Sequence, residues 1–111
     1  MEERPTSREE YIDKVLSAYR RTPGTVGAIR RPDRLLAAQL HERGVPLMAV
    51  ENALVLAAAR RMIRPAGSPP LATIRSLAYF LPVIEEVLQL KVSQEYFRHL
   101  RDRLHRAAST R

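Results

Sequence analysis

Apolar residues recur at helical spacing in five segments of the chain, and no segment has the strict alternation typical of a strand. The segments span residues 8–20, 32–43, 47–63, 71–90 and 93–108. Stretches rich in glycine and proline separate the first segment from the second and the third from the fourth. The pattern predicts an all-α fold, a single domain over residues 1–111 built as a bundle of about five helices.

Several of the expected helix ends carry recognisable sequence signals. Ser7 followed three residues later by Glu10 is the pattern of a capping box. Pro32 suits a first helical turn, where its missing amide hydrogen is not needed, and Gly44 suits a helix end. Pro82 lies in the middle of the fourth segment and cannot donate to the carbonyl four residues before it. We therefore expect a kink or a break there.

The third segment is apolar almost all round until Arg60, which predicts a central, buried helix. Each of the other segments has one apolar face, and this face predicts which side chains point inward. The expected inward residues are Tyr11, Ile12, Val15, Leu16 and Tyr19 in the first segment, Leu35, Leu36, Gln39, Leu40 and Arg43 in the second, Ile74, Leu77, Ala78, Leu81, Ile84 and Leu88 in the fourth, and Tyr96, Phe97, Leu100, Leu104 and Ala107 in the fifth.

Composition narrows the possible functions. The chain has no cysteine, which excludes disulfides, thiolate catalysis and cysteine-based zinc sites and fits a cytoplasmic location. No spacing of serine, histidine and acids resembles a catalytic or metal-binding motif, so we expect no enzyme, no metal and no cofactor. The longest apolar stretch, residues 47–59, contains Glu51 and Asn52 and is too short for a membrane span.

The charge is the strongest functional signal. Of the 19 basic residues 17 are arginines, and against 12 acids they give a net charge of +7. Residues 52–80 contain Arg60, Arg61, Arg64 and Arg75 and no acid. These arginines are our first candidates for contacts with nucleic-acid phosphates. Cations at the end of a helix also complement its dipole, which is the simpler interpretation.

Two further groups of arginines are candidates for the same role. Arg30, Arg31 and Arg34, together with Arg20 and Arg21, flank the first glycine-containing loop, and Asp33 is the acid among them. The last expected helix has Arg98, Arg101 and Arg106. An ordinary solvated surface is the alternative for both groups.

The second and third segments, joined at Gly44 and Val45, resemble a helix-turn-helix. A recognition helix needs polar residues near its N-terminus, whereas residues 47–50 are apolar, so we favour a plain helical hairpin. The neighbouring acids Glu85 and Glu86 suggest a solvated patch or a contact for a basic neighbour in an oligomer.

The pattern Val50-x-x-Ala53, followed by a segment with Tyr79, Val83 and Val87 at four-residue spacing, resembles the C-terminal helical domain of DnaD-like replication-initiation proteins. That family has a Tyr-x3-Ile-x3-Trp helix implicated in binding single-stranded DNA. The resemblance implies a position near DNA for Tyr79 and an accessory role in replication or in a mobile element. The chain departs from the pattern where Val87 replaces the tryptophan and where Pro82 interrupts the helix.

These observations favour a non-enzymatic protein that binds DNA or RNA, mainly through the phosphate backbone. The low aromatic content, 5%, argues against extensive stacking on bases. The alternative is a small helical interaction subunit, which docks on a larger protein or nucleoprotein complex or associates with itself.

Overall fold

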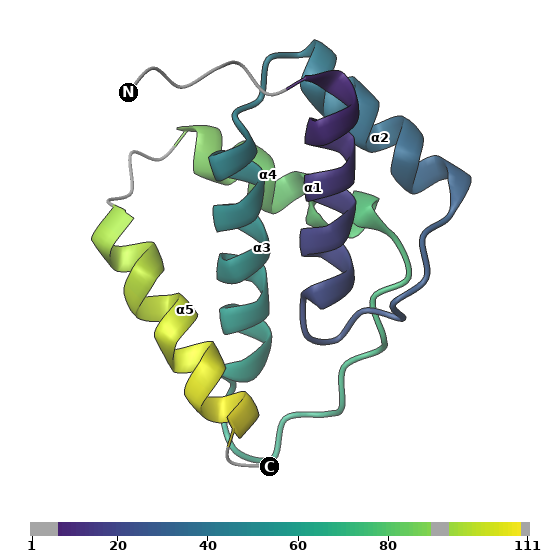
Figure 1. Cartoon of the computed structure of the whole chain (residues 1–111). Helices are drawn as coiled ribbons and strands as arrows, with labels where there is room; N and C mark the ends of the chain where they lie inside the picture. Colours follow the sequence, from purple (N-terminus) through teal and green to yellow (C-terminus); the bar gives the residue numbers. More distant parts are fainter. Residues whose placement is uncertain (1–6, 90–93, 110–111) are drawn as a thin grey trace.

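In the computed structural model the described residues are 7–89 and 94–109, and they form helices joined by loops, with no strand among them (Figure 1). The predicted all-α bundle is confirmed. Within these ranges none of the helices has the length and apolar character needed to cross a bilayer. The elements are α1 (Arg8–Arg21), α2 (Arg31–Glu42), α3 (Leu47–Met62), a short 3₁₀ helix η1 (Leu77–Phe80), α4 (Leu81–Gln89) and α5 (Gln94–Ser109).

Helix α3 is the central element, as its apolar sequence predicts. It packs against α1, α4, α5 and η1, and Figure 1 shows it between α1 and α5. The alanine side chains of α3 are small, so the neighbouring helices can approach it closely. The buried residues of α3 are Val50, Ala53, Leu54, Leu56, Ala57, Ala58 and Ala59.

Helix α2 turns only part of the predicted face inward, with Leu40 buried and Leu36 packed against the core. Ala37 and Leu40 are buried, whereas Leu35 is 54% exposed and Gln39 and Arg43 are also exposed. The buried face continues at its N-terminal end with Asp33, a polar residue that a search for apolar periodicity passes over. The prediction for Leu35, Gln39 and Arg43 was therefore wrong.

Helices α2 and α3 do not form a compact pair. Helix α2 packs on α1 and η1 instead of lying along α3, and Figure 1 shows α1 between them. The first turn of α3 is partly covered, with Leu47 and Ala49 half-buried and Val50 buried. The extensive packing of α2 along α3 that a plain helical hairpin needs is therefore absent from the described helices.

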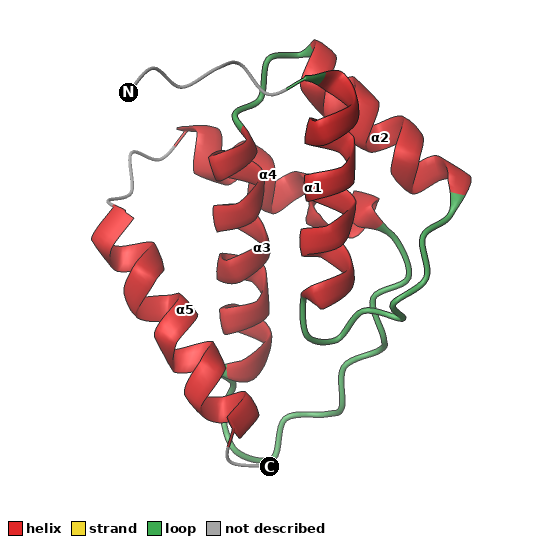
Figure 2. Ribbon diagram, in the orientation of Figure 1, coloured by secondary structure: helices red, strands yellow, loops and turns green. Residues whose placement is uncertain are grey.

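The fourth predicted helix begins later than expected. Residues 71–76 form no helix and instead run beside the first loop (Figure 2). The Ile74 amide donates to the Gly24 carbonyl at 2.7 Å, and the Val26 amide donates to the Ile74 carbonyl at 3.0 Å. These bonds form an isolated parallel bridge between Thr25 and Ile74. The two loops therefore satisfy each other's backbone groups.

The break expected at Pro82 is present. The chain changes there from η1 to α4, and Pro82 is the second residue of α4, where no amide hydrogen is required. A single helical period does not hold across this change of geometry. As a result Ala78 is exposed and Leu88 is 41% exposed, against the prediction, while Leu77 and Ile84 are fully buried.

Helix α5 packs on α3 through a small apolar cluster of Leu100, Leu56 and Ala59. Leu104 and Ala107 are half-buried, whereas Tyr96 is exposed, contrary to its prediction. The prediction for Phe97 lies outside the described side chains. The rest of α5 presents its arginines to solvent.

Candidate nucleic-acid interface

The Asp33 side chain links the start of α2 to the start of η1. One carboxylate oxygen accepts the Arg30 amide at 2.9 Å, and the other accepts the Leu77 amide at 2.9 Å. The side chain is 2% exposed. Buried carboxylates need such partners, and here the two amides fix the end of the first loop against η1. In the sequence Asp33 appeared only as a charge that offsets arginines.

Arg61 fastens the second loop. Its guanidinium donates to the Ala72 carbonyl at 2.8 Å and to the Tyr79 hydroxyl at 3.1 Å. The same group lies 5.6 Å from the centre of the Tyr79 ring, within cation–π range. Side-chain atoms of Arg61 also lie against Gly24 in the first loop. Arg61 thus holds together α3, both loops and η1.

Arg60 is paired with an acid from another helix. Its guanidinium makes two hydrogen bonds to the Glu86 carboxylate on α4, one of them 2.7 Å long. These bonds lower the pKa of Glu86 and raise that of Arg60. Glu85 forms an ion pair with Arg43 through one hydrogen bond of 2.6 Å. Arg60 is therefore neutralised, although residues 52–80 contain no acid. Both glutamates form ion pairs within the chain.

The predicted cluster at the end of α3 does converge in space. Arg60, Arg61, Arg64 and Tyr79 line one shallow hollow of about 350 Å³. Arg64 donates to the Pro69 carbonyl at 2.6 Å. Each of the three arginines therefore already has a partner in the protein. Arg75 is exposed on the second loop and does not line this hollow.

A second hollow, of about 390 Å³, lies beside the first loop, and we call it the first-loop hollow. It brings Arg34 of α2 together with Arg20 and Arg21 at the end of α1. Arg21 donates to the Ser17 carbonyl at 3.3 Å, whereas within the described chain Arg20 and Arg34 have no side-chain hydrogen bond or ion pair. The remaining lining residues are Asp13, Leu16, Ser17, Gly27 and Ile29.

The other predicted arginines are more scattered. Arg30 and Arg31 are exposed at the start of α2 but do not line the first-loop hollow. Arg98, Arg101 and Arg106 are exposed on α5. Arg101 lines a separate groove between helices, so these three side chains do not converge on one hollow.

Tyr79 lies in η1, where it is 46% exposed and packs edge-on against Phe80. Val83 and Val87, the other two positions of the resemblance, are half-buried in α4 against the core. The three residues therefore do not share one continuous helix. No protein-family model, curated protein or solved structure shows detectable similarity to this chain.

Proposed function

We propose that this protein binds nucleic acid without catalysis, mainly through phosphate contacts centred on the first-loop hollow. The observation that carries this proposal is the meeting of Arg20, Arg21 and Arg34 around one concave surface, where Asp13 is the acid in the lining. Guanidinium groups bind phosphate oxygens in pairs and keep their charge at any physiological pH.

The availability of these side chains favours the first-loop hollow over the end of α3. A phosphate that approaches Arg60 competes with the ion pair to Glu86, and a phosphate at Arg61 competes with the bonds that hold the second loop. Arg20 and Arg34 carry no such bond within the described chain. Gly27 has no side chain to hinder a ligand on the loop side of the hollow.

The remaining predicted arginines add positive charge to the surface but do not form a second binding site. Arg30 and Arg31 lie at the start of α2 next to the hollow's Arg34, and Arg75 lies on the second loop. The first turn of α3 carries Leu47, Met48 and Ala49 and no polar side chain, which supports contacts to the backbone over the reading of bases. An accessory role in replication or in a mobile element is the context that the DnaD-like resemblance suggests.

Binding of labelled single-stranded DNA, double-stranded DNA and RNA across a salt series tests the proposal. We expect affinity to fall steeply with salt, because each neutralised phosphate releases counterions, with a slope of about −0.9 per phosphate on duplex DNA. The preferred form of nucleic acid would identify the natural ligand class. If none of the three binds at low salt, the proposal is wrong.

Charge-reversal variants test the site. Arg20→Glu/Arg34→Glu removes two arginines of the hollow, and Lys14→Glu/Arg103→Glu changes the net charge equally at exposed positions outside it. We expect the first variant to weaken binding at least about tenfold and to flatten the salt slope by about 2. Equal losses in both variants would mean that total charge, and not the hollow, determines binding.

A further inference from the structure

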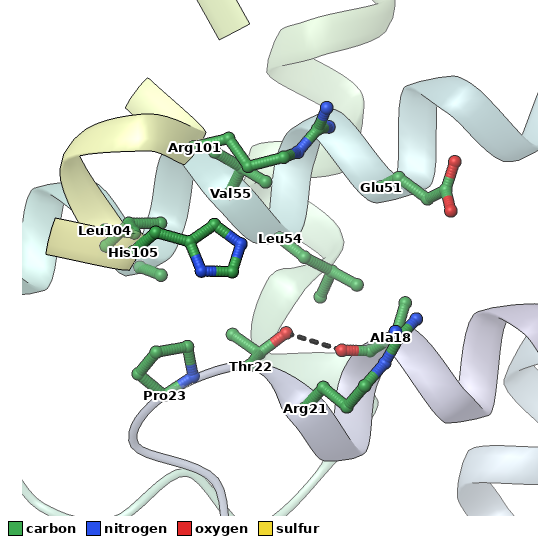
Figure 3. Close-up of a pocket in the computed structure, with 11 residues that line it drawn as sticks. Ala18, Arg21, Thr22, Pro23, Glu51, Leu54, Val55, Arg101, Leu104 and His105 are labelled. Atoms are coloured by element: carbon green, nitrogen blue, oxygen red, sulfur yellow. Dashed lines mark hydrogen bonds between the residues drawn. The ribbon is translucent and has the colours of Figure 1, made fainter. Parts of the chain in front are cut away.

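A groove with an apolar floor runs over α3 between α1 and α5, and we call it the α1–α5 groove (Figure 3). Its volume is about 430 Å³. Leu54, Val55 and Ala58 of α3 form the floor, and Leu104 of α5 lines it from the side. Val55 and Leu104 are only half-buried, so the groove exposes apolar surface between two helices.

Charged side chains lie on both sides of this floor and toward one of its ends. Figure 3 shows Arg101 of α5 and Arg21 of α1 on opposite sides of the opening, with Leu54 between them. Glu51 lies farther along α3, toward one end of the groove. The His105 ring of α5 also lines the groove. A matching ligand therefore needs an apolar middle that accommodates this ring, negative groups on both flanks and a positive or neutral group at the Glu51 end.

We propose that the α1–α5 groove docks an amphipathic, acidic helix from a partner protein. Such a helix presents apolar side chains at i, i+3, i+4 and i+7, which form one stripe that matches a groove between helices. Acidic residues beside the stripe reach Arg21 and Arg101, and a basic residue near one end reaches Glu51. Opposite charges at the rim orient the partner and exclude helices with the reverse pattern.

The lining distinguishes this partner from nucleic acid. Phosphates gain nothing from the apolar floor of Leu54 and Val55, and they are repelled by Glu51. The first-loop hollow, by contrast, is lined mainly by polar and charged groups. Apart from Arg21 the two sites share no lining residue, so one surface is suited to phosphates and the other to a protein. This inference does not depend on the proposed function.

A titration of isotope-labelled protein with synthetic helical peptides, followed by nuclear magnetic resonance, tests the proposal. The probe is a peptide of about 14 residues, or four turns, with a leucine stripe, glutamates on both flanks and one terminal lysine. A second peptide keeps the leucines and exchanges every charge. We expect the acidic peptide to shift the amide signals of Leu54, Val55 and Leu104 and to bind at least about tenfold more tightly than the reversed peptide.

A matched pair of variants on one helix makes the test specific. Arg101→Glu changes a residue of the groove, and Arg98→Glu makes the same change one turn away, outside the lining. Both positions are exposed, so the fold is preserved and circular dichroism verifies this. We expect Arg101→Glu to weaken the acidic peptide about tenfold and Arg98→Glu to leave its affinity within about twofold.

Three results would overturn the proposal. The first is equal binding of the two peptides, and the second is an equal effect of the two variants. The third is an oligonucleotide that shifts the signals of Leu54, Val55 and Leu104, because it would assign the groove to nucleic acid. At about 150 mM salt, where charges beyond about 8 Å are largely screened, Arg20→Glu/Arg34→Glu should leave peptide binding intact. Failure of one site is therefore distinguishable from failure of the other.

Discussion

The carboxylate of Asp33 accepts the backbone amide of Leu77 at 2.9 Å, although the two residues are 44 positions apart in the chain. The other oxygen of the same carboxylate accepts the Arg30 amide. One buried side chain thus caps α2 and fixes the start of η1. Arg34 of α2 and Gly27 of the adjoining loop both line the first-loop hollow. The Asp33 carboxylate therefore also fixes the position of this lining.

Removal of the Asp33 carboxylate should destabilise the protein. Asp33→Ala leaves the Arg30 and Leu77 amides without an acceptor, which we expect to cost about 2–4 kcal/mol of unfolding free energy. Asp33→Asn retains one acceptor oxygen and should cost less. Urea unfolding measures both, with the exposed Asp13→Ala as the control. A loss for Asp33→Ala within about 0.5 kcal/mol of the control would contradict the role of the carboxylate.

The helices that pack mainly through apolar contacts could be predicted from the sequence. The apolar stripe of α1 is buried at Tyr11, Val15, Leu16 and Tyr19, and α3 buries a continuous run of residues from Leu56 to Ala59. Apolar periodicity was sufficient there because each helix keeps a single geometry and packs through apolar contacts. It failed in α2, where the buried face starts at Asp33, a polar residue that is held by backbone amides.

Contacts between distant segments could not be predicted in this way. The backbone amide and carbonyl of Ile74 both bond to the first loop, about fifty positions earlier, and residues 71–76 form no helix. Glu86 neutralises Arg60 across two packed helices. A short stretch of sequence indicates only local helix propensity and local charge. The Ile74 pairing and the Arg60–Glu86 ion pair depend instead on tertiary packing. The convergence of Arg20, Arg21 and Arg34 has the same origin.

The two loops should be sensitive to a methyl group at Gly24. This residue has φ = 93°, and a Cβ atom there would lie 3.2 Å from Arg61 Nε. Gly67 has φ = 84° but open space around it. Both Gly→Ala changes add strain of about 1–2 kcal/mol, and Gly24→Ala should cost more because it displaces the Arg61 side chain that holds Ala72. Thermal unfolding of the two variants measures the difference, and equal losses would mean that Arg61 yields without cost.

The two buried tyrosines of α1 should respond oppositely to loss of their hydroxyl groups. The Tyr11 hydroxyl donates to the Val45 carbonyl at 2.8 Å, so Tyr11→Phe should cost about 1 kcal/mol. The Tyr19 hydroxyl is buried with no hydrogen-bond partner in the described chain. Tyr19→Phe should therefore be neutral or stabilising. Chemical unfolding of the pair tests this, and a larger loss for Tyr19→Phe would reveal a partner for that hydroxyl.

Stability should also fall in strong alkali because of the same residues. Burial raises the pKa of Tyr11 from 10.0 to about 12, against the opposing effect of Arg43. Burial also raises the pKa of Tyr19, and the charge of Asp33 acts in the same direction. Because the folded pKa exceeds the unfolded value, the neutral phenol of Tyr11 contributes fully below about pH 10, and its contribution is lost between about pH 10 and 12. Unfolding free energies at about pH 8 and pH 11 should therefore differ less in Tyr11→Phe than in the parent protein. The same decrease in both proteins would show that Tyr11 does not titrate with the fold, and the ultraviolet absorbance of tyrosinate would then identify which phenols ionise first.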